Sequence, residues 1–219
     1  MSKTTAPLLS FGASGAIAKT QVYASWRGIP YARRYVVPGN PNTDAQKQTR
    51  NTFGWLNQVW KLFDPSVQAP WTLFSKGRPF FNRNAFISSN LSALRGTTDD
   101  PAMDLSGMVV SPGANGGLAA ANITTADDAA HGLTITLTAP ALPAGWSITK
   151  AHFVALKQQA AETDKFYTSH YAFDAADPYT TTFAAIGAGT YAAFGYFEYM
   201  KPDGSTAFSP SLYHAQIVA

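Results

Sequence analysis

Four histidines are the first side chains that could support catalysis or bind a metal ion. They lie at His131, His152, His170 and His214, all in the C-terminal half of the chain. A local metal motif needs two ligands a few residues apart, as in His-Glu-x-x-His, and no two of these histidines have that spacing. His152 and His170 could approach each other across neighbouring strands, but exposed or hydrogen-bonded strand histidines are several times more common. The chain contains no cysteine, which excludes disulfides, thiolate zinc sites and a cysteine nucleophile.

A second pattern superficially resembles a phosphate-binding loop: Gly12-Ala13-Ser14-Gly15, followed by Lys19-Thr20. That loop requires a glycine immediately before the lysine, so that the backbone can wrap around the phosphates, and Ala18 occupies this position. The segment also precedes an expected strand rather than a helix. Both features favour an ordinary hairpin loop.

Two acidic pairs, Asp99–Asp100 and Asp127–Asp128, could supply paired carboxylates for acid–base catalysis. Both fall in loop-like segments, where solvated turns are the favoured interpretation. The sequence also lacks the Gly-x-Ser-x-Gly elbow of serine hydrolases. We therefore predict that the protein is not an enzyme and that it has no catalytic residue, no cofactor and no metal site.

Arginines interleaved with aromatic residues form the pattern that is best suited to binding. The predicted interface residues are Trp26, Arg27, Tyr31, Arg33, Arg34 and Arg50. Such a surface could bind single-stranded nucleic acid through base stacking and charge. Trp, Tyr and Arg are also the residues that dominate protein–protein binding hot spots. Because no nucleic-acid-binding motif accompanies them, we expect a protein interface, with nucleic acid as the weaker alternative.

The segments that position these residues are organised around one helix. Thr43 and Gln46 fit a capping box, in which each side chain bonds the backbone N–H of the other residue. Pro41 disfavours a helical conformation at Asn40, so the helix cannot begin earlier. An apolar stripe of helical period then runs to the expected end of the helix near Asp64–Pro65. The members of the stripe are Phe53, Leu56, Val59, Trp60 and Phe63. We interpret this element as a docking helix that carries no catalytic group.

Before this helix, residues 8–37 are predicted to form a β-hairpin with strands at 17–26 and 29–37. The second strand alternates apolar residues onto one face, and Arg33 lies on the same face. The apolar members of that face are Ile29, Tyr31, Tyr35 and Val37. We expect the hairpin to be only partly buried, or to pack against another molecule.

Two further helices are expected after the principal helix. Asp64 is predicted to cap the first, with proline at its first position, and Asn82 to cap the second. A hairpin and two or three helices make a compact α+β unit, so we assign residues 1–100 to a basic hairpin-and-helix docking domain. Its large aromatic residues either form its core or contact a neighbouring molecule. They are Trp55, Trp60, Trp71, Phe80 and Phe81.

The polar segment 97–101 is the predicted domain boundary, because the hydrophobic period beyond it changes to two. Short strands separated by Pro/Gly turn signals are expected at 108–111, 133–138, 149–157, 166–173, 179–183, 191–199 and 207–218. This pattern is typical of an all-β sandwich of the immunoglobulin or fibronectin type, which we assign to residues 101–219. Tyr191 fits a tyrosine corner. Ala193 stands where an immunoglobulin domain has its second cysteine, but fibronectin-like modules also lack the disulfide.

Charge is distributed unevenly over these two predicted domains. Residues 1–100 contain twelve Lys/Arg and four Asp/Glu, whereas residues 101–219 contain four Lys/Arg and nine Asp/Glu. Only 13% of all residues are charged, which is fewer than in an ordinary cytosolic enzyme and suits β-rich proteins in assemblies. The sequence shows no secretion signal and no apolar run near the ~20 residues of a membrane span. We expect a protein that is made in a cytoplasm and stays soluble until it meets a partner.

Residues 12–60 combine several of these features in one order. The pattern is Gly15-x-Ile17, Val22-Tyr23, Trp26-Arg27-Gly28-Ile29-Pro30-Tyr31, Arg33, Pro38 and Asn40-Pro41-Asn42-Thr43-x-x-Gln46-x-x-x-Arg50-x-x-Phe53. It resembles a group of poorly characterised virion structural proteins of tailed bacteriophages and prophages, in which a similar basic hairpin and Asn-Pro-x-Thr helix precede a variable β-rich part. The resemblance implies association with the virion and carries over no catalytic residue. A C-terminal immunoglobulin-like module fits it, because such modules commonly decorate phage capsids and tails.

The leading hypothesis is a non-enzymatic virion structural protein, most concretely a capsid decoration protein. Its N-terminal half would dock on other virion proteins, and the protein would be a homo-oligomer or be present in many copies. The alternative within this class is a tail or baseplate accessory protein. The alternatives from other classes are a nucleic-acid-binding protein that uses the basic hairpin and a carbohydrate-binding module that uses the Tyr-rich edges of the sandwich.

Overall fold

The structure, a computed structural model, describes residues 2–3, 13–26, 29–37, 39–94, 105–128, 132–157 and 169–218. The chain divides into two compact units, Met1–Asn42 and Thr43–Ala219, which we call the N-terminal unit and the C-terminal unit. With three helices and several antiparallel sheets, the protein is of the α+β class and has a β-rich part, as the sequence predicted.

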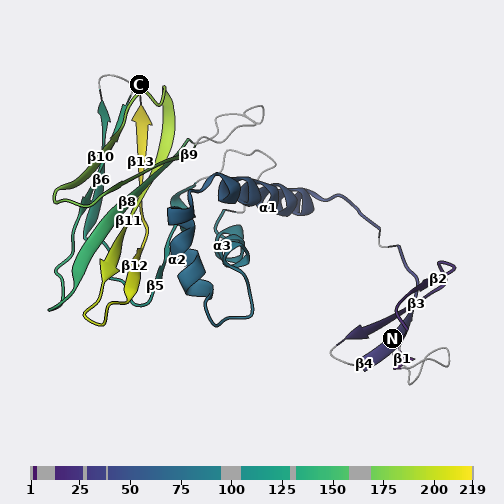
Figure 1. Cartoon of the computed structure of the whole chain (residues 1–219). Coiled ribbons are helices and arrows are strands. Elements are labelled where there is room, and N and C mark those ends of the chain that lie inside the picture. The colour runs from purple at the N-terminus through teal and green to yellow at the C-terminus, as the bar shows by residue number, and fades with distance from the viewer. Residues whose placement is uncertain are drawn as a thin grey trace. The chain divides into compact units, whose positions relative to one another are not determined.

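The N-terminal unit is a four-stranded antiparallel sheet in the order β1-β4-β3-β2 (Figure 1). The strands are β1 Ser2–Lys3, β2 Gly15–Ile17, β3 Gln21–Trp26 and β4 Ile29–Arg34. Strands β3 and β4 form the predicted hairpin, although β4 ends three residues earlier than expected.

The predicted strand at 17–26 is interrupted by a tight turn. Ala18 and Lys19 adopt positive φ values of 46° and 54°, and the Thr20 amide donates to the Ile17 carbonyl at 2.9 Å. Positive φ at both central residues defines a type I′ turn, whose twist matches that of the two strands it joins. Lys19 therefore lies in a hairpin turn between β2 and β3, inside the segment where the sequence predicted one continuous strand.

Three helices open the C-terminal unit: α1 Asp44–Leu62, α2 Pro65–Ser75 and α3 Asn82–Leu91. Thr43 is the N-cap of α1 as predicted, but its side chain makes no capping hydrogen bond, so the capping box is wrong. Its backbone carbonyl accepts from the amides of Gln46 and Lys47 instead. The cap of α2 is confirmed, because Asp64 Oδ1 accepts from the Ser66 amide at 2.8 Å. The α3 N-cap is Phe81, one residue before the expected Asn82.

The buried stripe of α1 differs from the prediction at one position. Phe53 is 49% exposed, whereas Thr52 and Trp55 are buried together with the expected Leu56, Val59, Trp60 and Phe63. At 100° per residue, Phe53 lies about a quarter-turn from the centre of the buried stripe. Three- and four-residue spacing alone did not distinguish the centre of the stripe from its edge.

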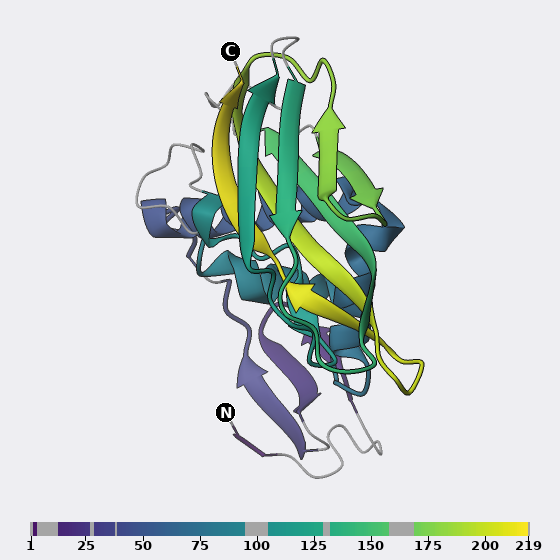
Figure 2. The same cartoon turned by 90° about the vertical axis from the view of Figure 1, so that its left-hand side faces the viewer.

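The rest of the C-terminal unit consists of two antiparallel sheets. A three-stranded sheet has the order β10-β7-β6, with β6 Asn122–Asp128, β7 Gly132–Thr138 and β10 Tyr179–Phe183. The larger sheet has the order β5-β12-β11-β8-β9, with β13 also paired to β11. Its strands are β5 Pro112–Ala114, β8 Ser147–Lys157, β9 Ser169–Asp174, β11 Gly189–Met200, β12 Thr206–Pro210 and β13 Leu212–Val218. Figure 2 looks onto the smaller sheet, and the long strands of the larger sheet pass behind it.

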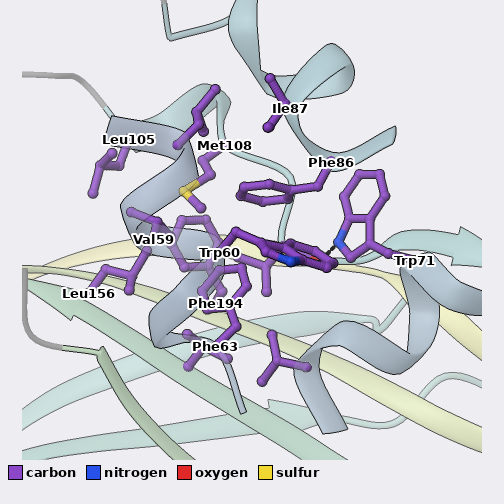
Figure 3. Close-up of a cluster of buried hydrophobic side chains, with 14 of the residues drawn as sticks. Val59, Trp60, Phe63, Trp71, Phe86, Ile87, Leu105, Met108, Leu156 and Phe194 are labelled. Atoms are coloured by element: carbon purple, nitrogen blue, oxygen red, sulfur yellow. Dashed lines mark hydrogen bonds between the residues drawn. The ribbon is translucent and has the colours of Figure 1, made fainter. Parts of the chain in front are cut away.

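Two apolar cores flank the larger sheet, because its central strand β11 is buried on both faces. Phe194 and Tyr196 belong to the core on the helix side, whereas Tyr191, Phe197 and Tyr199 belong to the core between the two sheets. On the helix side, aromatic residues of all three helices pack with strands β8 and β11 (Figure 3). The close-up includes Trp60, Phe63, Trp71, Phe86, Leu156 and Phe194.

The shared helix–sheet core changes the expected division of the chain. The sequence placed the three helices with the hairpin in residues 1–100, whereas the structure groups them with the C-terminal strands and divides the chain after Asn42. The physical reason is that the apolar faces of the helices share a core with strands β8 and β11 of the same unit. The predicted boundary segment 97–101 itself lies outside the described residues.

The strand predicted at 108–111 is not formed, because a buried side chain takes the place of a neighbouring strand. Asn90 of α3 is fully buried, and its Oδ1 accepts from the Val109 amide at 2.7 Å. Its Nδ2 donates to the carbonyls of Val109 and Phe86 at 3.0 and 2.9 Å. The indole of Trp71 donates to the Val110 carbonyl at 2.6 Å. These bonds fasten the segment to the helices, and the short strand β5 follows at 112.

The predicted strand at 207–218 is divided into β12 and β13 at Ser211. Pro210 has no N–H for a ladder, and serine hydroxyls bridge the break. Ser209 Oγ accepts from the Phe197 amide at 2.8 Å, and Ser211 Oγ accepts from the Val110 amide at 3.1 Å. The two pieces therefore continue along the same edge of β11.

The smaller sheet contains a strand that the sequence analysis did not predict. Strand β6 was missed, and the structure places Asp127 in it, opposite Leu133 in the β6–β7 ladder, rather than in a loop. Asp128 is paired with Gly132 at the end of the same ladder.

The tyrosine corner is confirmed: the Tyr191 hydroxyl donates to the carbonyls of Ile186 at 2.6 Å and Gly187 at 3.1 Å.

Candidate interaction surface

The predicted interface residues fall into both compact units. Trp26, Tyr31, Arg33 and Arg34 lie on the hairpin strands of the N-terminal unit. Arg27, in the connection between these strands, lies outside the described residues. Arg50 lies on α1 in the C-terminal unit, is exposed, and donates through Nε to the Gln46 carbonyl at 3.2 Å.

The ladder between β3 and β4 determines which residues share a face, because residues directly opposite each other in an antiparallel pair point to the same side. Trp26 is opposite Ile29, Ala24 is opposite Tyr31, and Val22 is opposite Arg33. These pairs place one apolar and basic group on a single face. We call it the tryptophan face, and its large members are Val22, Trp26, Ile29, Tyr31 and Arg33.

The opposite face of the same strands is smaller and more polar. Tyr23 is opposite Ala32, Ser25 is opposite Pro30, and Gln21 is opposite Arg34. Arg34 therefore does not belong to the tryptophan face, although the sequence analysis grouped it with Arg33. Alternation along the strand accounts for the separation, since neighbouring residues point to opposite sides.

The tryptophan face is largely exposed in the described structure. Trp26 is 64% exposed and Ile29 45%, Arg33 is exposed, and Val22 and Tyr31 are half-buried. An exposed tryptophan beside other apolar side chains and an arginine has the composition of an interface hot spot. The sequence analysis placed Ile29 on the same face as Tyr31 and Arg33 but did not count it among the interface residues. It missed Val22, although alternation along the first hairpin strand could have identified this residue.

The N-terminal unit carries basic side chains but no acidic ones. Residues 1–42 contain five Lys/Arg and no Asp/Glu, whereas the remainder contains eleven Lys/Arg and thirteen Asp/Glu. No cation of the N-terminal unit can therefore pair with a carboxylate side chain of its own unit. This concentrates positive potential on the unit.

A second exposed aromatic surface lies between α2 and α3. Phe80 is 36% exposed and Phe81 79%, and they line a shallow groove of about 440 Å³ with Arg78 and Asn82. The Arg78 guanidinium stacks over the Phe74 ring at 4.0 Å. Of the aromatic residues considered in the sequence, Phe80 and Phe81 are therefore exposed, whereas Trp55, Trp60 and Trp71 are core residues.

His152 forms the main buried polar cluster of the C-terminal unit. Its Nδ1 lies 2.9 Å from the Tyr171 hydroxyl and its Nε2 lies 3.0 Å from Glu198 Oε2. The ring stacks on Tyr196 at a centroid distance of 4.7 Å, and the Tyr196 hydroxyl donates to the Ser66 carbonyl at 3.3 Å. The ring therefore bonds through both nitrogens, to a hydroxyl on one side and to a carboxylate on the other.

The contacts and burial in this cluster also shift the pKa values of its acidic and phenolic groups. The hydrogen bond from His152 lowers the pKa of the Glu198 carboxyl below its ordinary value. Burial raises the pKa of the Tyr171 hydroxyl and raises the pKa of the Tyr196 hydroxyl well above its ordinary value. Both ring nitrogens of His152 are engaged, so the cluster links β8, β9, β11 and the start of α2. This is the hydrogen-bonded strand histidine that the sequence analysis favoured over a catalytic one.

Within the described residues, no group of three His, Asp or Glu side chains is placed to hold a metal ion. No helix of the described part of the chain is both long enough and apolar enough to cross a membrane. A search with this sequence found no matching protein-family model and no matching curated protein.

Proposed function

We propose that this protein is a non-enzymatic structural component of a tailed-bacteriophage virion, most concretely a capsid decoration protein. It docks through its N-terminal unit and is localised in the virion. The observation that carries the proposal is the tryptophan face, an exposed apolar and basic surface on a separate compact unit of the chain. The sequence resemblance to virion proteins covers residues 12–60, which include this face.

The proposal also assigns a fibronectin-like sandwich to the β-rich part of the C-terminal unit. Two antiparallel sheets share a core, and the order β9-β8-β11-β13 opposite β10-β7-β6 supports the assignment. The corner made by Tyr191 supports it as well. In this proposal the sandwich is the displayed part of the protein, and the three helices that share a core with it connect it to the docking unit.

Incorporation into particles tests the docking proposal. The double variant Tyr31→Ala with Arg33→Ala removes an aromatic residue and a cation from the tryptophan face. A matched control is Phe173→Ala with Lys150→Ala, an exposed aromatic residue and a cation on the C-terminal unit, with the ammonium 5.0 Å from the ring centroid. We expect the first variant to be absent from purified particles and the control to be present at the wild-type level.

Several results would contradict the proposal. Normal incorporation of the tryptophan-face variant together with loss of the control would place docking on the C-terminal unit. A nucleic-acid-binding protein is the alternative that the acid-free N-terminal unit supports. Tight binding of oligonucleotides that weakens steeply with salt, combined with normal incorporation of both variants, would favour that alternative.

A further inference from the structure

The N-terminal unit has a sheet but almost no core of its own. Among its described residues only Ala32 is buried, and this side chain is small. In the C-terminal unit, by contrast, Phe194, Tyr196 and Phe197 of a single strand are all fully buried. An isolated two-stranded hairpin is marginally stable at best in water, and further strands make a sheet independently stable only when they bring an apolar face. Strands β1 and β2 add only two and three residues to the hairpin of β3 and β4.

The usual substitutes for a core are also missing from this unit. Domains of about 40 residues or fewer normally require disulfides, a metal ion or association with another chain. The chain has no cysteine, and the described residues of the unit contain no histidine, aspartate or glutamate that could bind a metal ion. Association is the remaining route to a stable sheet, and the tryptophan face is the surface it would cover.

The composition of the tryptophan face specifies what covers it. A surface that covers this face needs apolar side chains at its centre, against Val22, Trp26 and Ile29. It needs a carboxylate at its edge, where it can pair with Arg33. A second copy of the N-terminal unit cannot supply that carboxylate, because residues 1–42 contain no Asp or Glu. Two such units placed face to face would bring only like charges together. Residues 4–12 of the same chain lack acidic residues for the same reason.

We infer that the N-terminal sheet is completed by its partner: it becomes stably folded only when the tryptophan face is covered by a protein surface with an apolar centre and acidic residues around it. This inference rests on the proposed docking function and names its partner class. The free protein then consists of a folded C-terminal unit and an N-terminal segment that is not protected as a sheet. Docking supplies the missing core and neutralises the cations in the same step.

Hydrogen–deuterium exchange of the full-length protein tests this inference. It is measured by mass spectrometry on the free protein at low and high concentration, and on the protein in purified particles. In the free protein we expect peptides covering β3 and β4 to exchange within ~10-fold of the unstructured rate, while β8 and β11 stay protected. In particles we expect exchange in β3 and β4 to slow by ~100-fold or more.

Two other exchange patterns each identify a different occupant and overturn the inference. Protection of β3 and β4 in the free protein at all concentrations would mean that the chain covers the face itself, through residues 4–12 or the C-terminal unit. Protection that increases with concentration would mean that a second copy covers it. A protein that is absent from particles, but whose β3 and β4 exchange freely in solution, would contradict the proposed function alone.

The acidic character of the partner is tested by two matched variants of the tryptophan face. Arg33→Glu reverses the charge on this face, whereas Arg33→Lys keeps it. We expect the glutamate variant to lose at least ~10-fold in particle occupancy and the lysine variant to retain most of it. Equal occupancy of the two variants would overturn the assignment of an acidic partner surface.

Discussion

The two compact units use the same kinds of residue in opposite ways. The C-terminal unit buries Trp71, Tyr191 and Phe194 completely, whereas the N-terminal unit leaves Trp26 64% exposed. In the first case aromatic residues hold helices and sheets around two cores. In the second they lie on an acid-free sheet, on a face whose described side chains are largely exposed. These aromatic residues are therefore buried in one unit and exposed in the other, although they are similar in kind in the sequence.

Paired truncations in the two units give the largest expected difference. Phe194→Ala removes a buried ring from the helix–sheet core and should lower the free energy of unfolding by about 4 kcal/mol. Trp26→Ala removes a larger, exposed side chain and should change the free energy of unfolding by less than ~0.5 kcal/mol. Urea denaturation followed by near-UV circular dichroism measures both. A loss for Trp26→Ala comparable to that for Phe194→Ala would show that the tryptophan face is buried within the free protein.

Asn90→Ala probes how the helices are fastened to the strands. The change leaves the Val109 amide and carbonyl without their side-chain partner inside the protein, and we expect a loss of about 3 kcal/mol. Asn57→Ala is the control, since Asn57 is only half-buried and its Oδ1 accepts from Arg83 at the surface. We expect the control to lose less than ~1 kcal/mol. Equal losses in the same denaturation assay would contradict the structural role of Asn90.

Tyr191→Phe isolates the corner hydrogen bonds. The ring remains to fill the core, but the hydroxyl that donates to Ile186 and Gly187 is lost, so we expect a loss of about 1 kcal/mol. Thermal unfolding should show a midpoint lowered by a few degrees. An unchanged midpoint would mean that the hydroxyl bonds do not stabilise the connection before β11.

The pH dependence of stability should report Glu198. Its pKa is lowered in the folded protein by the hydrogen bond from His152, so the stabilisation is fully present above the ordinary glutamate pKa of ~4.3 and is lost as the pH falls through the lowered pKa. Denaturation midpoints of the wild type should therefore decrease more steeply in this acidic range than those of Glu198→Gln. Parallel pH profiles for the two proteins would contradict the linkage.

Thr43→Ala should have the smallest effect. An N-cap threonine whose side chain bonds the backbone is typically worth ~1 kcal/mol. Here the side chain makes no such bond, so we expect a change of only a few tenths of a kcal/mol. Asp64→Ala is the matched comparison, because Asp64 does cap α2 through its side chain and should lose about 1 kcal/mol. A larger loss for Thr43→Ala than for Asp64→Ala would restore the capping box.

Local signals in the sequence predicted most elements but not how they join. Turn residues, caps and periodicity located the hairpin, the three helices, the strand Tyr179–Phe183 and the tyrosine corner. They did not show that Asn90 replaces a strand partner for Val109, because that bond joins residues nineteen positions apart. They also did not show that the helices share a core with the strands, since an apolar stripe does not reveal which surface covers it.

The candidate surface was predicted in composition but not in geometry. Trp26, Tyr31 and Arg33 do share one face, as the alternation in the second hairpin strand suggested for the last two. Arg34 lies on the other face, and Arg50 belongs to the other compact unit. Clustering in sequence grouped these arginines, whereas strand alternation and the division of the chain separate them.

The central claim is that the N-terminal unit attaches the protein to an assembly and the C-terminal unit does not. Cryo-electron microscopy of purified particles tests it most directly, because it locates both units against the neighbouring proteins. The account predicts that the sheet of β1–β4 contacts the particle through the tryptophan face, and that the two-sheet part of the C-terminal unit projects into solvent. Particles in which the C-terminal sheets make the contact, with the tryptophan face open to solvent, would contradict it.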